Sequence, residues 1–282
     1  MDELHNLFVP LTVPDYLTIS SFVHAVRTPD RCPTAPSSKP PHARNLAVPI
    51  LWFEDELTAA IGARTNGGIE PSSLGAFVQN RIIALDADGV LLDYNLGYAE
   101  AWKQAFGVYP KEKDPNAYWA QDRWDVDLLD GDRLEHFRSS FDETFWESLY
   151  ALPGAIQACR DLKSAGYLLV CVTALPEQFA VARQRNLQRL GFPIELVLAT
   201  GSHVDGKSPK ADALHLLRPA VFVDDYLPYM AGVRPGIHRA LITRNPNGSP
   251  NTGDGLLSVA SRHNSLWEFS EWWLTQFASN RN

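Results

Sequence analysis

Cysteine is scarce in this sequence. Only Cys32, Cys159 and Cys171 occur among its 282 residues, and no two of them form a Cys-x-x-Cys pair. A set that is odd in number and widely spaced implies no disulfide framework, so we expect buried thiols in a reducing compartment.

Long hydrophobic runs are absent as well. The sequence contains no stretch of about 18 apolar residues, the length that a membrane-spanning helix needs. Its start, Met-Asp-Glu-Leu-His, has neither the basic flank nor the apolar run of a signal peptide. We therefore expect a cytoplasmic protein that does not enter the membrane.

Positive charge is also in short supply. The 25 Lys and Arg residues face 33 Asp and Glu residues, which gives a net charge of −8. A negative net charge opposes the counterion release by which proteins bind nucleic acids and anionic membrane surfaces. We expect neither nucleic acid nor membrane among the partners.

What the sequence does contain is enough apolar material for a globular protein of about two domains, with 45% hydrophobic residues. Residues 1–80 show no clean periodicity and include a Pro-rich linker at 29–44. We interpret them as an N-terminal extension, which together with the C-terminal segment is a possible contact surface for a homo-oligomer.

From residue 81 onward, short apolar runs alternate with helical patterns, as in a parallel α/β sheet. The runs are rich in Val, Ile and Leu, as strands buried on both faces should be. The pattern predicts a Rossmann-like core of five parallel strands at 82–85, 167–172, 194–198, 220–223 and 239–243.

Helices are predicted between these strands, at 153–165, 177–190 and 209–217, where Gly or Pro marks the end of each one. A long interruption at 94–150, with helical runs at 95–106 and 133–149, predicts a small helical cap inserted after the first strand. The α/β core then comprises 81–93 and 151–245. Residues 246–282 form a C-terminal loop and a helix, for which Ser265 and Glu268 have the spacing of a capping box.

Two acids follow the first predicted strand directly, in the sequence Asp86-Ala87-Asp88-Gly89. Ligands of open α/β sheets bind beyond the carboxyl ends of the strands, so these carboxylates are candidates for a functional site. Residues two apart on an extended backbone point the same way, which lets Asp86 and Asp88 face one substrate. Carboxylates that repel one another favour a hard cation such as Mg²⁺.

Polar residues recur at the other strand ends. Thr173-Ala174 offers a hydroxyl and backbone amides for a phosphate oxygen, and Asp224-Asp225 offers a second acidic pair. A lysine between them, either Lys207 or Lys210, is available to offset anionic charge.

In this order, the residues resemble the motifs of the haloacid dehalogenase-like hydrolases, over about residues 81–245. Asp86-Ala87-Asp88-Gly89-Val90 is similar to the first motif of that superfamily, Thr173 to the second, a lysine to the third and Asp224-Asp225 to the fourth. The resemblance implies a phosphatase-type member with a helical cap and a small phosphorylated metabolite as substrate.

The resemblance also implies roles for the residues. Asp86 is the expected nucleophile and Asp88 the expected general acid and base. Thr173, Ala174 and Lys210, with Lys207 as the alternative, are the expected phosphate-binding residues. Asp86, Asp88 through its carbonyl, and Asp225 with Asp224 are the expected ligands of Mg²⁺.

The sequence departs from the family pattern in two places. Ala174 stands where many relatives carry a polar side chain, and no acid follows Asp225 at a distance of four or five residues. These departures and the long N-terminal extension leave a non-catalytic binding or regulatory protein as an alternative to the Mg²⁺-dependent phosphohydrolase. A sugar-phosphate mutase is a second alternative, because it would share Asp86, Asp88 and the cap.

Overall fold

The computed structural model describes residues 81–201 and 208–278. All of them fall within one compact unit of the chain, Ile69–Asn282. The predicted N-terminal extension, its Pro-rich linker, Cys32 and Lys207 lie outside the described residues.

The predicted parallel sheet is confirmed, and all its strand pairs are parallel. In the described residues it has six strands in the order β3-β2-β1-β4-β5-β6. The strands are β1 (Ile82–Leu85), β2 (Leu168–Thr173), β3 (Leu196–Ala199), β4 (Val221–Asp224), β5 (His238–Ile242) and β6 (Ser261–His263). The central strand β1 is buried along its whole length, as its run of Ile, Ala and Leu requires.

The prediction of five strands was one short. The sixth strand, β6, consists of Ser261, Arg262 and His263 and pairs with β5 at the edge of the sheet. Three polar residues give no apolar run, so the sequence pattern does not indicate a strand here. The strand forms because its backbone is hydrogen-bonded to β5.

The helices of the core follow the predicted positions with small shifts. They are α8 (Ala155–Ser164), α9 (Ala180–Leu190), which follows a single turn η2 (Glu177–Phe179), α10 (Ala211–Leu217) and α11 (Leu266–Ala278); two further short turns are η3 (Leu227–Met230) and η4 (Asp254–Ser258). Helix α11 packs against α8 and buries Leu266, Phe269 and Trp273. The predicted capping box is present in modified form: Ser265 Oγ accepts a hydrogen bond from the Glu268 amide, while the Glu268 carboxylate accepts one from the Asn264 amide.

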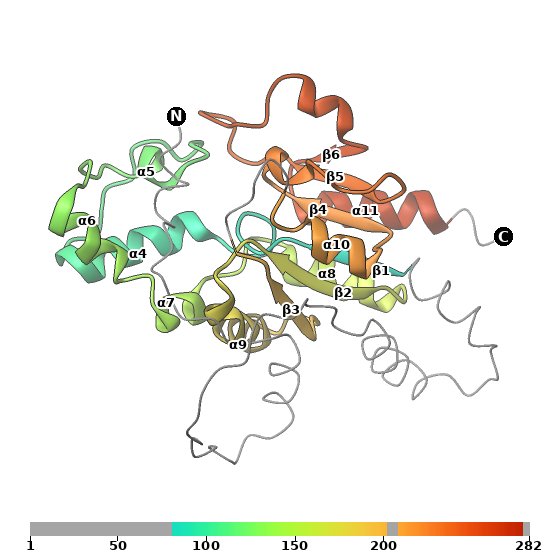
Figure 1. Ribbon diagram of the computed structural model, residues 1–282, viewed down its shortest axis with the longest axis horizontal. Coiled ribbons are helices and arrows are strands. Elements are labelled where there is room, and N and C mark those ends of the chain that lie inside the picture. The colour runs from blue at the N-terminus through green and yellow to red at the C-terminus, as the bar shows by residue number, and fades with distance from the viewer. Residues whose placement is uncertain (1–80, 202–207, 279–282) are drawn as a thin grey trace, which may run out of the picture. The chain divides into compact units, whose positions relative to one another are not determined.

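The residues between β1 and α8 form helices and loops, with isolated β-bridges such as the one between Glu112 and Trp124. The helices are α4 (Tyr94–Phe106), α5 (Ala120–Arg123), α6 (Gly131–Arg138) and α7 (Glu143–Ser148). Figure 1 shows them on the side of the sheet where β1 ends. We call residues 94–150 the helical insertion.

One predicted helix, 133–149, is in fact two. Asp142 interrupts it, because its carboxylate accepts a hydrogen bond from the Phe145 amide and thereby caps the start of α7. The break lets the aromatic rings of Phe137, Phe141 and Phe145 pack edge to face in the centre of the insertion.

The insertion leaves and re-enters the core through two neighbouring linkers. The Asp93 amide donates to the Tyr150 carbonyl, and the Leu152 amide donates to the Leu91 carbonyl. The two crossings of the chain are thus hydrogen-bonded side by side.

Cys159 and Cys171 are buried free thiols, as predicted. Among the described residues, no helix has the length and hydrophobicity needed to cross a membrane.

Candidate active site

Asp86 lies at the carboxyl end of the central strand. Its amide donates to the Val223 carbonyl at 2.9 Å, which continues the pairing of β1 with β4 by one residue. The chain then turns back on itself, because the amides of Leu91 and Leu92 both donate to the Ala87 carbonyl. This turn leaves the residue Asp86 only 5% exposed, with its side chain directed into the space beyond the sheet.

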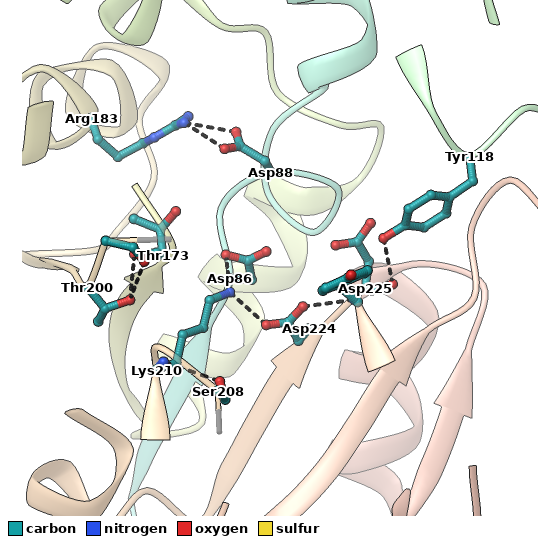
Figure 2. A network of polar contacts seen from close by, with 12 residues as sticks. Asp86, Asp88, Tyr118, Thr173, Arg183, Thr200, Ser208, Lys210, Asp224 and Asp225 are labelled. Carbon is teal, nitrogen blue, oxygen red and sulfur yellow. Dashed lines mark hydrogen bonds and ion pairs between the residues drawn. The ribbon is translucent and has the colours of Figure 1, made fainter. Parts of the chain in front are cut away.

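Lys210 joins the first acid to the end of strand β4. Its ammonium Nζ lies 2.6 Å from Asp86 Oδ1 and 2.7 Å from Asp224 Oδ2, and its side chain is completely buried (Figure 2). Burial by itself would lower the pKa of this lysine, but Asp224 and Asp86 outweigh that effect and raise it. Lys210 therefore remains an ammonium ion inside the site.

Asp225 is held from several sides. Its Oδ2 accepts a hydrogen bond from Arg244 Nε at 2.6 Å, and its carbonyl accepts from the Tyr118 hydroxyl at 3.2 Å and the Asn251 amide at 2.7 Å. Burial raises the pKa of the Asp225 carboxyl, with Arg244 acting in the opposite direction. These contacts fix Oδ2 and leave Oδ1 available to a ligand.

Three carboxylates form a candidate metal centre. Asp86, Asp224 and Asp225 each offer an oxygen, these oxygens lie within 4.8 Å of one another, and all three residues are buried. Oxygen donors of this charge are the ligands that Mg²⁺ prefers. The donor set present in the structure thus fits the implied cation.

Thr173 and Ala174 lie at the carboxyl end of the neighbouring strand β2. Thr173 is 2% exposed, and its carbonyl accepts hydrogen bonds from the Thr200 amide and hydroxyl, at 3.0 and 3.2 Å. Ala174 follows with a half-buried side chain. The bonds tie the end of β2 to the end of β3, so the Thr173 side chain stands on a fixed backbone.

Asp88 is not part of the three-carboxylate cluster. Both of its carboxylate oxygens accept from Arg183 Nη2, each at 2.9 Å, and Figure 2 shows this pair on the far side of Asp86 from Asp224. Burial raises the pKa of Asp88 to about 6, although Arg183 lowers it. A carboxyl with such a pKa can both donate and accept a proton near neutral pH.

Gly89 allows the side chains of Asp225 and Arg244 to come close to the backbone. It has a φ of +89°, and a Cβ at this position would overlap Asp225 Oδ2 and Arg244 Nε. Only glycine meets both conditions without strain.

No family model matches this sequence, and no curated protein matches it. Solved structures do match. A HAD family hydrolase from Deinococcus radiodurans R1, solved with bound phosphate and sodium, is 16% identical and gives a TM-score of 0.51 over 70% of this chain and 96% of that chain. The chain has the haloacid dehalogenase-like fold.

Two further structures are similar at a lower TM-score. A predicted phosphoglycolate phosphatase from Haemophilus somnus 129PT is 18% identical, with a TM-score of 0.46 over 69% of this chain and 98% of that chain. A HAD-superfamily hydrolase from Geobacter sulfurreducens PCA is 12% identical, with a TM-score of 0.46 over 69% of this chain and 96% of that chain.

In this haloacid dehalogenase-like fold, the residues singled out from the sequence lie around the carboxyl ends of β1, β2 and β4. Asp86, Lys210, Asp224 and Asp225 are in one cluster, and Asp88 is beside it. Lys207, the alternative to Lys210, lies outside the described residues.

Sequence reasoning missed Arg183 and Arg244. Arg244 follows Thr243, just past the carboxyl end of β5, so the rule that pointed to Asp86 and Asp224 could have found it. Arg183 lies in the middle of α9 beside other arginines, and no spacing distinguishes it from them. Only the folded structure shows that its side chain reaches Asp88.

Proposed function

We propose that this protein is a Mg²⁺-dependent phosphohydrolase that cleaves a small phosphomonoester through a phosphorylated aspartate. The arrangement of Asp86, Lys210, Asp224 and Asp225 at the carboxyl end of the sheet supports the proposal best. It combines a carboxylate nucleophile, a buried cation to attract a phosphoryl group and oxygen ligands for a metal.

In the first step, a carboxylate oxygen of Asp86 forms a bond to phosphorus while the bond from phosphorus to the leaving oxygen breaks. Asp88 gives its proton to that oxygen, and the alcohol departs. Lys210 and Thr173 face the phosphoryl oxygens in this assignment and offset their negative charge.

In the second step, the oxygen of a water molecule attacks the phosphorus of the aspartyl phosphate, and Asp88 accepts the proton that the water loses. The bond from phosphorus to Asp86 breaks, so the carboxylate is restored and inorganic phosphate is released. The pKa of about 6 at Asp88 supports both halves of this proton exchange.

Mg²⁺ would be held by Asp86, the carbonyl of Asp88 and the fourth-motif acids. We favour Asp225 over Asp224 as the direct ligand, because Asp224 already binds Lys210 through Oδ2 and the Tyr226 amide through Oδ1. When bound, the cation supplies positive charge that stabilises the phosphoryl oxygens in the transition state.

The test is a screen of phosphomonoesters with MgCl₂, in which the release of inorganic phosphate is measured. Asp86→Asn, which removes the nucleophile, should reduce turnover by about 10³-fold or more, whereas Asp132→Asn on an exposed helix of the insertion should be as active as the wild type. No turnover of any ester, or full activity in Asp86→Asn, would contradict the proposal. Isomerisation of a sugar phosphate without phosphate release would indicate the mutase instead.

A further inference from the structure

Arg183 is a buried charge with one hydrogen-bonding partner. Its side chain has no solvent exposure, and its Nη2 contacts both oxygens of Asp88 at 2.9 Å. Among the described residues, its Nε and Nη1 have no hydrogen-bond partner. Buried arginines normally use most of their donors, because an unsatisfied donor costs free energy. Arg183 thus uses only part of its hydrogen-bonding capacity, and the part that it uses is directed at Asp88.

The insertion provides the other contact of this side chain. The guanidinium carbon of Arg183 lies 5.2 Å from the centre of the Trp146 ring, on α7. The face of an indole ring attracts a cation and restricts where a planar guanidinium can lie. Arg183 is thus held between a ring of the insertion and a carboxylate of the core.

Two further residues of helix α9 bind the carboxyl end of α7 and the residue that follows it. The Asn186 side-chain amide donates to the carbonyls of Glu147 and Leu149, at 2.8 and 2.9 Å, and Arg189 donates to the Glu147 carbonyl at 2.9 Å. Hydrogen bonds to the backbone fix the position of α7 more closely than contacts between flexible side chains. The Trp146 ring is therefore held at a defined height above Arg183.

Trp146 of the insertion thus contacts Arg183, and Arg183 contacts Asp88, which we assign as the proton donor. We propose that Arg183 is a positioning residue for Asp88: it holds the carboxylate toward the leaving group, and it does so only while Trp146 of the insertion lies against it. The inference rests on the proposed function, since it assigns a second residue to the step in which Asp88 protonates the leaving oxygen.

A misplaced proton donor should slow the hydrolysis of some substrates and leave the hydrolysis of others unchanged. An alkyl phosphate needs a proton on its leaving oxygen, whereas 4-nitrophenyl phosphate releases a phenolate that leaves without one. The parameter kcat/KM covers the steps up to formation of the aspartyl phosphate, so it reports this protonation and not the later attack of water. The ratio of kcat/KM for the two esters therefore measures how well Asp88 is positioned.

The experiment compares Arg183→Met with the wild type on an alkyl phosphate that the wild type hydrolyses and on 4-nitrophenyl phosphate. We expect kcat/KM to fall by about 100-fold for the alkyl ester, within the usual contribution of general acid catalysis, and by less than about 5-fold for the aryl ester. Arg183→Lys, which retains the charge without the planar geometry, should recover part of the alkyl activity. Arg160→Gln, which changes an exposed arginine on α8, should match the wild type on both esters.

Equal losses on the two esters would overturn the inference, because they would mean that Arg183 supports the fold in general. If Arg183→Met does not fold, Arg183→Lys decides the question, since a selective loss of alkyl activity is expected there as well, in smaller degree. Trp146→Leu should also lower the alkyl activity selectively, and an equal effect on both esters would overturn the link to the insertion. If the wild type hydrolyses no phosphomonoester at all, so that no substrate exists for this comparison, the proposed function itself is contradicted.

Discussion

The ammonium group of Lys210 lies 2.6 Å from Oδ1 of Asp86, in a place that solvent does not reach. A second carboxylate, from Asp224, lies at a similar distance on the other side. One cation thus neutralises two acids that would otherwise repel each other at the end of the sheet. Under the proposed function, this cation would also offset the charge of the phosphoryl group that reacts with Asp86.

Replacing Lys210 by Met should destabilise the protein, because it leaves buried carboxylates without their counter-ion. The expected loss is about 3–5 kcal/mol, the usual cost of breaking a buried ion pair from one side. Urea unfolding without divalent cations measures it. Lys163→Met, which breaks an ion pair with Glu195 at the surface, should cost less than about 1 kcal/mol. Equal effects of the two substitutions would contradict this account of Lys210.

Adding Mg²⁺ should stabilise the wild type and should stabilise Asp225→Asn much less. A cation that binds only the folded chain adds about 2.7 kcal/mol when its concentration is 100 times the dissociation constant. Thermal unfolding over a range of MgCl₂ concentrations, with a chelator as the zero point, measures the effect. Asp127→Asn, at an exposed position of the insertion, is the control and should respond as the wild type does. Stabilisation of Asp225→Asn by the same amount as the wild type would show that this residue is not a ligand.

Gly89→Ala should cost both stability and activity. The added Cβ would overlap Asp225 Oδ2 and Arg244 Nε, and the φ of +89° strains any residue with a side chain. Gly107→Ala is the matched control, since Gly107 has a φ of +78° but no atom within 4 Å of the added Cβ. We expect a loss of about 1 kcal/mol for the control, from backbone strain alone, and a clearly larger loss for Gly89→Ala. Circular dichroism melting curves compare the two, and similar losses would argue against the close approach at Gly89.

Acidification should weaken the edge of the sheet where β5 meets β6. His238 Nε2 and His263 Nε2 lie 2.8 and 2.9 Å from the Ser261 hydroxyl, and burial lowers the pKa of both imidazoles. Just below pH 6.5, the two histidines therefore bind more protons in the unfolded chain than in the folded one. The stability that the neutral histidines contribute is present above pH 6.5 and is lost as the pH falls below it.

The measurement is urea unfolding at several values of pH between 5 and 8, on the wild type and on the double variant H238Q and H263Q. Asp88, whose pKa is raised to about 6, changes stability in the opposite sense, so the difference between the two proteins isolates the histidines. The difference in free energy of unfolding between the wild type and the double variant should narrow as the pH falls below 6.5. Curves that stay parallel would contradict the prediction.

Much of the core was predictable because its strands are short apolar runs buried on both faces. The predicted strand at 82–85 agrees with β1 at both ends. Strand β6 was not predicted, because its pairing with β5, and not its own composition, makes it a strand. The helix predicted at 133–149 was broken by Asp142, whose carboxylate competes for a backbone amide in a way that periodicity does not register.

The candidate site was predictable as far as one rule reaches, namely that the carboxyl ends of parallel strands meet at one edge. Asp86, Thr173 and Asp224 follow from that rule. Arg183 does not, because a long side chain from the middle of a helix carries its charge far from its backbone position. The pair of Asp88 and Arg183 joins two elements of the core, the loop after β1 and helix α9, that lie 95 residues apart in the sequence, and periodicity does not register such a contact.

The paired linkers at Asp93 and Leu152 bring the two ends of the insertion next to each other on the core. Because the chain leaves and re-enters the core through two adjacent, hydrogen-bonded linkers, a short loop between them would be enough to connect β1 to α8. A shorter loop or a foreign helical segment could span the same two points without disturbing β1 or α8. Exchange of residues 94–150 would also remove Tyr118 and Trp146, which contact Asp225 and Arg183, so it would change how the carboxylates are held while the sheet keeps its connectivity.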